Sequence, residues 1–180
     1  MSERLVTERE LEGVLRRLTE LEQRLGRVEV TEVPIVQVGT WEPKLSGDGV
    51  QPGVFTYNAT VTIGYYTRDG NRVDFDARVL ITAITTPPTA GSNIRISLPT
   101  IYTVATSPTP FAGVAYIDAQ TGVTYTAGYG RISGYVLSAS PFLYLRQTGS
   151  GVAAANILAG NIGLVGGNID FVIAGSYRVA

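Results

Sequence analysis

The sequence predicts a mostly β protein, with an antiparallel jelly-roll or β-sandwich head preceded by a short N-terminal α-helical coiled coil. Three observations predict this class. Apolar residues follow a heptad pattern near the N-terminus, the remainder alternates apolar and polar residues, and 13 of the 29 charged residues lie within positions 1–30. These changes of pattern separate a stalk over residues 1–29, an extended linker over 30–38 and a head domain over 39–180.

The apolar heptad positions of the N-terminal segment are all filled. Positions a and d over three heptads hold Leu11, Val14, Leu18, Leu21, Leu25 and Val28. Apolar residues at this spacing drive two or more helices to supercoil. A single helix of this length is marginal in water, so its apolar face needs a partner. Thr7 and Glu10 have the spacing of a capping box, which predicts a helix start near Glu8.

Charged residues flank this apolar stripe in a repeated motif, Arg-apolar-x-x-apolar-Glu. One copy runs from Arg17 to Glu22 and the second from Arg24 to Glu29. In a parallel coil, each arginine at position g faces the glutamate at position e of its neighbour's next heptad. The motif resembles the trimerisation motif of short three-stranded coiled coils, so we expect a homotrimer. The apolar positions alone also allow a dimer or tetramer, and the alternative is an amphipathic helix packed on its own β domain.

Beyond the linker, short runs of alternating apolar and polar residues predict strands. The expected strands are Val54–Thr67, Asn71–Thr85, Ile94–Leu98, Gly113–Asp118, Val123–Ala127, Arg131–Leu137, Phe142–Arg146 and Ile169–Val179. In the first run, Phe55, Tyr57 and Tyr65 are expected on one face. Asp69-Gly70-Asn71 predicts a hairpin turn after it. Residues 156–164 are either a loop or one helical turn. Short strands without a second helix favour a sandwich or jelly roll.

Composition excludes several functional classes. The chain has no cysteine and no histidine, which removes disulfides, thiolate chemistry, Ser-His-Asp arrangements and the usual zinc sites. We therefore expect no catalytic residues, no bound metal and no cofactor. A net charge of −1 does not favour nucleic acid or an anionic membrane as partner. No apolar run resembles a membrane span or a signal peptide, so no membrane insertion is expected.

Two carboxylates are the best candidates for catalysis. Asp74 and Asp76 lie two residues apart on one expected strand face and could act as a glycosidase-like pair. Because Arg72 and Arg78 flank them, a solvated, ion-paired face is the favoured interpretation, and the protein is predicted not to be an enzyme. The Gly-Asp-Gly sequence at 47–49 could hold a cation, but such sequences more often form a turn.

Several short motifs of the head occur in a characteristic order. They are Gly39–Pro43 (GTWEP), Tyr65–Arg68 (YYTR), Gly70–Val73 (GNRV), Ile94–Pro99 (IRISLP) and Gly175–Arg178 (GSYR). Their order and spacing resemble the C-terminal jelly-roll head domains of tailed-bacteriophage tail fibres and related trimeric virion appendages. Glu42 replaces the small polar residue usual in that family, and residues 102–127 do not align with it. Trp41 is interpreted as a structural plug at the base of the head, with a ligand platform as the alternative.

The resemblance implies a bacteriophage virion structural protein, assembled in the host cytoplasm. It would be a homotrimeric tail fibre or appendage, attached to other virion proteins through residues before Leu11. Its head would recognise a host-surface glycan or protein, and the loops Pro87–Asn93 and Thr106–Ala112 are the expected places for this; no particular ligand-binding residue is indicated. The alternative is a capsid decoration protein or head fibre with a purely structural role. A small cytosolic trimer, such as a lectin-like module, is a third possibility.

Overall fold

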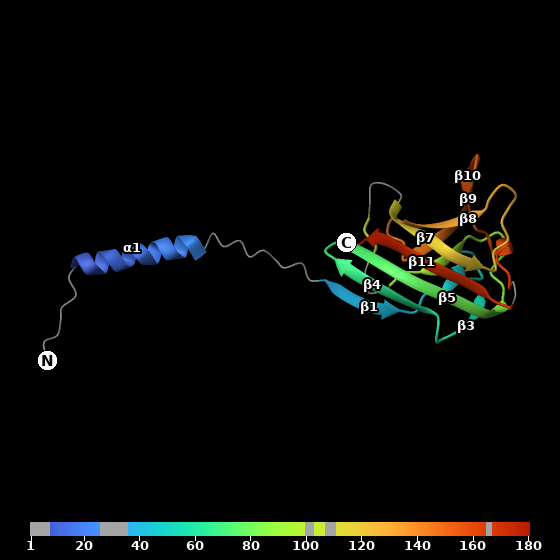
Figure 1. Ribbon diagram of the computed structural model, residues 1–180, viewed down its shortest axis with the longest axis horizontal. Helices are drawn as coiled ribbons and strands as arrows, with labels where there is room; N and C mark the ends of the chain where they lie inside the picture. The colour runs from blue at the N-terminus through green and yellow to red at the C-terminus, as the bar shows by residue number, and fades with distance from the viewer. Residues whose placement is uncertain (1–7, 26–35, 100–102, 107–110, 165–166) are drawn as a thin grey trace. The chain divides into compact units, whose positions relative to one another are not determined.

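The computed structural model describes residues 8–25, 36–99, 103–106, 111–164 and 167–180. The chain divides into two compact units, Met1–Pro34 and Ile35–Ala180. The described part of the first unit is the helix α1 (Glu8–Leu25), and all described strands belong to the second unit, the head (Figure 1). The helix begins at the predicted residue. The first strand begins at Gln37, two residues before the expected start of the head.

In its described residues the head contains eleven strands and one short 3-10 helix. These elements are β1 (Gln37–Trp41), β2 (Leu45–Gly47), β3 (Val54–Tyr57), β4 (Ile63–Asp69), β5 (Arg72–Thr86), β6 (Ile94–Ser97), β7 (Phe111–Thr121), β8 (Arg131–Leu137), β9 (Phe142–Gly149), β10 (Val152–Asn156), η1 (Ala159–Asn161) and β11 (Ile169–Arg178). The strands form an antiparallel sheet in the order β1-β4-β5-β11-β7-β8-β9-β6-β2, with β3 beside β5 and β10 beside β9.

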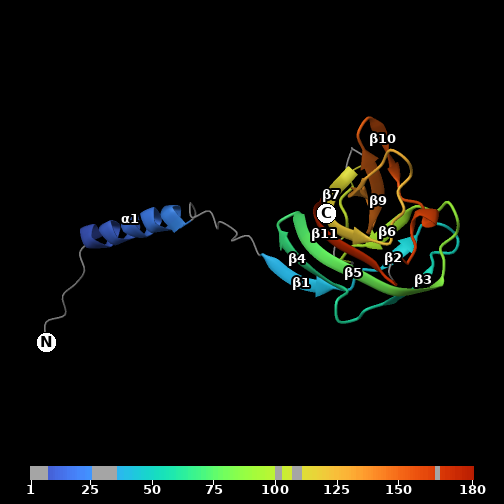
Figure 2. The same cartoon turned by 45° about the vertical axis from the view of Figure 1, so that its right-hand side comes forward.

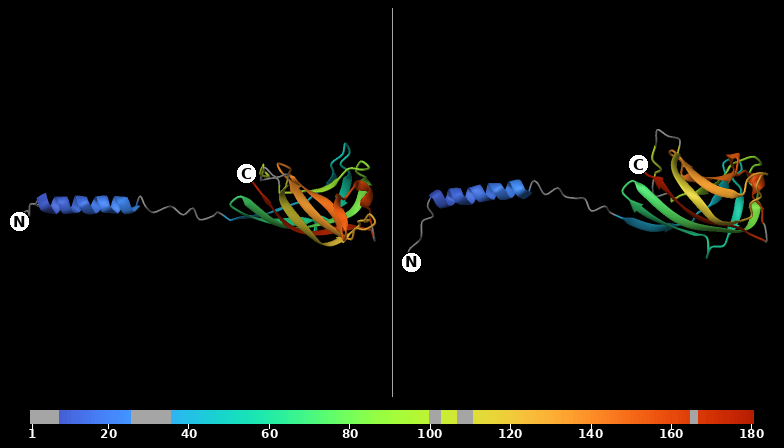
Figure 3. Two further views of the ribbon diagram at one scale, coloured as in Figure 1. Left: turned by 90° about the horizontal axis from the view of Figure 1, so that it is seen from above. Right: turned by 45° about the horizontal axis from the view of Figure 1, so that its top comes forward.

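This sheet curls over on itself, as Figures 1 and 2 show, so that its two halves face each other. Figure 3 shows the same curl from two further directions. Side chains from both halves meet in one core, including Phe75 and Val79 of β5, Phe171 of β11, and Leu143 and Leu145 of β9. The prediction of a mostly β, antiparallel head is therefore confirmed. The two layers are halves of one continuous hydrogen-bonded sheet. The finer assignment as a jelly roll stays a prediction.

The alternation predicted for the longest strand is confirmed. Along the first half of β5, Val73, Phe75 and Ala77 are buried, while the charged residues between them are exposed. The hairpin before β5 is also confirmed, since Asp69 of β4 pairs with Arg72 of β5. Gly70 makes this turn possible because its φ of 57° lies in the left-handed region that glycine adopts without strain.

The run Val54–Thr67 was expected to be one strand, and this expectation is wrong. The structure divides it into β3 and β4, separated by a turn in which Asn58 O accepts hydrogen bonds from the amides of Val61 (3.1 Å) and Thr62 (2.8 Å). The turn reverses the alternation of faces. Tyr57 packs against the core, whereas Tyr65, expected on the same face, is 57% exposed.

Two other regions differ from expectation. The expected strand Val123–Ala127 is not formed, and Val123 makes only an isolated bridge with Ile162. In the ambiguous segment 156–164 the structure contains η1, so the helical turn is the correct alternative. The strands β1, β2 and β10 were not predicted, because each is short and lacks a clear alternating pattern.

Candidate functional site

The predicted assembly residues whose side chains are described lie together on α1. Val14, Leu18 and Leu21 follow the i, i+4, i+7 spacing that places residues on one face of a helix. In the single chain these side chains are 51–57% exposed, and the adjacent Leu15 is 58% exposed. An apolar stripe of this kind is typical of a helix face that packs against another apolar surface.

Two of the charged residues predicted to flank the stripe, Arg17 and Glu22, are also exposed. Arg17 and Glu22 lie on α1, and their predicted pairing is between copies, so a single chain does not test it. Within the helix, Arg16 Nε lies 3.7 Å from Glu20 Oε1, a solvent-exposed pair of small energetic value. The remaining predicted residues fall outside the described side chains: Leu11, Arg24 and Leu25 within α1, and Val28 and Glu29 outside the described residues altogether.

The candidate carboxylate pair lies on the outer face of β5. Arg72 Nη2 donates to Asp74 Oδ1 at 2.7 Å, as the ion-paired interpretation predicted. Arg78 pairs instead with Asp170 of β11, donating from Nη2 (2.7 Å) and Nε (3.1 Å) to its two carboxylate oxygens. This hydrogen-bonded pairing raises the pKa of Arg78. Asp74 is therefore held by a cation of its own strand.

Asp76 lies instead in a shallow groove of about 450 Å³ across the outer face of the sheet. Strand register places Tyr65 of β4, Asp76 of β5, Ala174 of β11 and Tyr116 of β7 in one row across the sheet. Tyr65 and Tyr116 are 57% and 64% exposed and line the groove. The small side chain of Ala174 lies between them in the row, so the groove offers two aromatic rings and one carboxylate.

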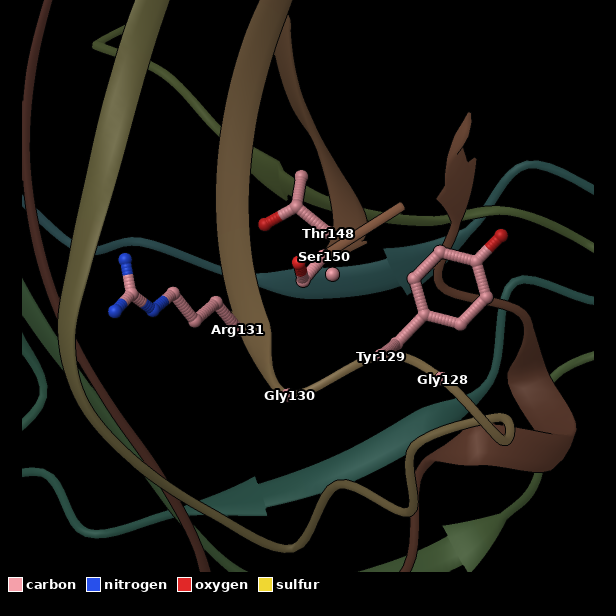
Figure 4. Close-up of a pocket in the computed structure, with 7 residues that line it drawn as sticks. Gly128, Tyr129, Gly130, Arg131, Thr148 and Ser150 are labelled. Carbon is pink, nitrogen blue, oxygen red and sulfur yellow. The ribbon is translucent and has the colours of Figure 1, made fainter. Parts of the chain in front are cut away.

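A second pocket, of about 700 Å³, lies at the end of β8 and β9 (Figure 4). It is lined by the turn Gly128–Arg131 and by Thr148–Ser150. The hydroxyl of Tyr129 donates to Ala153 O at 2.7 Å, and Gly130 N donates to Thr148 O at 3.1 Å. Figure 4 shows Tyr129 and Arg131 directed to opposite sides, with the hydroxyls of Thr148 and Ser150 between them. The pocket is suited to hydrogen bonding with a polar ligand.

The loops expected to carry recognition are only partly described. Residues 107–110 of Thr106–Ala112 lie outside the described residues. Pro87–Asn93 is held against the loop between β2 and β3, since Thr89 N donates to Gln51 O at 2.9 Å. The carboxylate of Asp48 accepts hydrogen bonds from Asn93 N and Nδ2, both at 2.8 Å. The Gly-Asp-Gly sequence therefore links two loops, which supports the turn interpretation over the cation site.

No cluster of three or more His, Cys, Asp or Glu side chains in the described ranges could hold a metal ion. No helix in the described ranges is both long enough and apolar enough to cross a membrane.

A surface that the sequence analysis did not single out lies on the outer face of β6, β8 and β9. We call it the arginine–aromatic face; its residues are Arg95, Tyr135, Phe142, Tyr144 and Arg146. The rings of Tyr135 and Tyr144 stack with centroids 5.5 Å apart and planes at 20°. Arg146 lies over the Tyr135 ring at 5.4 Å, and Arg95 lies over the Phe142 ring at 3.8 Å. Strand alternation in the two predicted runs could have revealed that the β8 and β9 residues share a face.

Comparison with known proteins gives a likeness of fold to a solved structure. No protein-family model matches the sequence, and no curated protein matches it. Among solved structures, the crystal structure of Dettilon tailspike protein (gp208) is similar, with a TM-score of 0.62 and 19% sequence identity. The likeness covers 81% of this chain but only 24% of that one. At this identity it establishes a shared fold with about a quarter of a tailspike chain.

Proposed function

We propose that this protein is a bacteriophage virion structural protein, a homotrimeric tail fibre or appendage whose head recognises the host surface. The observation that carries this proposal is the fold that the chain shares with part of a phage tailspike. The head motifs of the sequence support it independently, because they resemble those of tail-fibre head domains.

The proposed homotrimer is supported by α1. Val14, Leu18 and Leu21 form an apolar stripe that is more than half exposed in the single chain. In a parallel three-stranded coil this stripe becomes the buried seam, and Arg17 lies next to Glu22 of the neighbouring copy. Three identical heads would then act together, and such avidity raises weak single-site binding by roughly 10²–10⁴.

The proposed role is non-enzymatic. Asp74 is ion-paired with Arg72 and Arg78 with Asp170, so the outer face of β5 resembles a charged surface more than a catalytic carboxylate pair. We expect purified protein to release no reducing sugar from host envelope polysaccharide. Release that is abolished by Asp74→Asn or Asp76→Asn, but not by Asp69→Asn on the neighbouring strand, would contradict this.

The decisive experiment locates the protein on the particle of the phage that encodes it. Antibody labelling and electron microscopy should place it on the tail, and purified protein should compete with phage for adsorption to host cells. Labelling over the capsid shell, together with undiminished adsorption, would replace this proposal with the capsid decoration role. Absence from purified particles would contradict both.

A further inference from the structure

Charge is unevenly distributed between the two halves of the sheet. Between positions 77 and 169 the sequence has four arginines, no lysine and a single acid, Asp118. The strands β6, β8, β9 and β10 contain three of these arginines, Arg95, Arg131 and Arg146, and no aspartate or glutamate. By contrast, the outer face of β5 carries two arginines and two aspartates. On β6, β8, β9 and β10 the positive charge is therefore not balanced by acids of the same strands.

The three arginines share the outer face of that half. Strand register places Arg131 opposite Thr148, Arg146 opposite Ser133, and Arg95 opposite Tyr144. Buried residues alternate with them along each strand and belong to the core, so the arginines point outward. Among the described side chains, none of the three takes part in a salt bridge.

The aromatic rings hold two of these guanidinium groups against the sheet. Arg95 lies 3.8 Å from the Phe142 centroid and Arg146 lies 5.4 Å from the Tyr135 centroid. A guanidinium group stacked on a ring keeps the N–H groups at its edge available, and these match the two oxygens of a carboxylate. Arg95 uses Nε to donate to Ser46 Oγ at 3.3 Å, which leaves its terminal nitrogens for a ligand.

A chain of hydrogen bonds fixes the central tyrosine. The hydroxyl of Tyr135 donates to Asn156 Oδ1 at 3.0 Å, and Asn156 Nδ2 donates to Asn93 Oδ1 at 2.8 Å. Asn93 Nδ2 in turn donates to Asp48 Oδ2 at 2.8 Å. The ring of Tyr135 is thereby held flat against Tyr144, and Phe111 of β7 meets it edge-on at 5.6 Å. The face is ordered before any ligand binds, which lowers the entropic cost of binding.

We propose that the arginine–aromatic face, extended by Arg131, binds an acidic polysaccharide. Phe142 and Tyr144 are partly exposed beside the arginines and offer apolar ring surface to the C–H face of a sugar ring. The arginines offer charge-assisted hydrogen bonds to carboxylates carried by successive sugars. This inference rests on the proposed function in that it names the class of host-surface ligand.

Charge and chemistry favour this ligand over other anions. Nucleic acid also stacks on aromatic rings, but a chain with a net charge of −1 lacks the broad basic surface that phosphate backbones require. A second copy of the chain would have to bring its own acids to this face. The acids of the described head strands lie on β4, β5, β7 and β11, where Asp74 and Asp170 are already paired.

The test measures binding of the 180-residue chain to immobilised bacterial polysaccharides that contain uronate or sialate. The same polymers after carboxyl reduction serve as neutral counterparts, and oligo(dT) serves as the nucleic acid. We expect binding to at least one acidic polymer, loss on carboxyl reduction and weakening with added salt. The double variant Arg95→Gln/Arg146→Gln should weaken binding about tenfold or more, since each arginine supplies a hydrogen bond to a charged group.

Matched variants separate this site from overall charge. Arg16→Gln/Arg178→Gln removes the same charge from α1 and β11 and should leave binding unchanged. Tyr144→Leu keeps apolar bulk but removes a ring, and it should also weaken binding. Thermal unfolding of each variant shows whether the head remains folded. If the Arg95/Arg146 variant is unfolded, the single variant Arg146→Lys, which keeps the charge but loses the planar group, should weaken binding while retaining the wild-type unfolding temperature.

The outcomes distinguish this inference from the proposed function. Equal binding to acidic and reduced polymers, binding to oligo(dT) alone, or no effect of the face variants would overturn the polysaccharide site. If the protein still competes for adsorption in those cases, the recognition role stands and its ligand lies elsewhere. If instead the face binds acidic polymer but the protein is absent from virions, the site stands and the proposed function fails.

Discussion

Trp41 of β1 packs closely over Gly64 of the neighbouring strand β4. Trp41, on β1, lies edge-on to Phe75 with centroids 5.9 Å apart, and its indole Nε1 donates to Ser97 O at 3.1 Å. The ring passes directly over Gly64 of β4, where an added Cβ would lie 2.3 Å from it. The contacts favour the interpretation of Trp41 as a structural plug, because its ring and its polar atom are both engaged by the head.

We therefore expect Gly64→Ala to destabilise the head by about 1–3 kcal/mol, the usual cost of forcing extra volume into a packed site. The tryptophan must move, and its hydrogen bond to Ser97 is then weakened. Gly163→Ala is the matched control, since an added Cβ there meets nothing within 4 Å. Urea unfolding followed by tryptophan fluorescence measures both. Equal stability of the two variants would show that the ring can shift without cost.

Tyr57 gives the head a dependence on alkaline pH. Burial raises the pKa of Tyr57 to about 12. The hydrogen bond that the hydroxyl accepts from Leu45 N lowers this pKa, and the charge of Glu42 raises it by a smaller amount. The unfolded chain holds tyrosine near its ordinary value of about 10. The neutral hydroxyl thus contributes stability that is fully present below pH 10 and is lost as pH rises toward 12.

Stability measured by urea unfolding should accordingly fall between about pH 10 and pH 12, and Tyr57→Phe should show a smaller fall. At pH 8 the same variant should be less stable than wild type, because Leu45 N and O lose their partner at 2.8 and 3.2 Å. Tyr65→Phe, at an exposed tyrosine of β4, should keep the wild-type pH dependence. An identical fall in all three proteins would assign the effect to other groups.

At the scale of elements, α1 is the helix on which the proposed trimer depends. Eighteen residues form a helix, yet a lone helix of this length is marginal in water. Leu18→Asp would put a like charge from each copy at one level of the proposed seam, where desolvation and repulsion both oppose assembly. Sedimentation equilibrium should then give a mass below three chains, whereas wild type should give three.

Gln23→Asp is the control, because it introduces the same residue at an outward heptad position of α1. It should keep the trimer mass. If Leu18→Asp also remains trimeric, contacts between heads hold the trimer together, and the exposed groove around Tyr65 and Tyr116 becomes the first surface to examine. A monomeric wild type at micromolar concentration would contradict the coiled coil itself.

For the whole molecule, the proposed polarity places attachment at the N-terminus and recognition on the head. Since α1 begins at Glu8, removing residues 1–7 leaves the apolar stripe intact. The shortened protein should still be a trimer and still compete for adsorption, but it should be missing from assembled particles. Normal incorporation of the shortened protein would mean that another part of the chain attaches it, and would favour a head that lies against the shell.

The sequence alone determined the features that depend on local pattern. The heptads place α1 and its stripe, and alternation places the faces of β5, because side-chain direction within one unbroken element follows from periodicity. Asp69-Gly70-Asn71 identifies a hairpin because a tight turn needs a residue that tolerates positive φ. Because the sequence has no cysteine and no histidine, disulfides, thiolate chemistry and Ser-His-Asp arrangements are excluded whatever the fold.

Only the tertiary structure decided how separate elements combine. The turn at Asn58 places Tyr65 on the exposed face of the sheet. The alternation of apolar and polar residues over Val54–Thr67 does not show that the strand is interrupted there. The pairing of Arg78 with Asp170 joins residues 92 positions apart, and strand order alone brings them together. The arginine–aromatic face likewise requires β6, β8 and β9 to become neighbours. Periodicity gives the direction of a side chain within its strand, whereas its neighbours across the sheet depend on long-range hydrogen bonding that the local sequence does not encode.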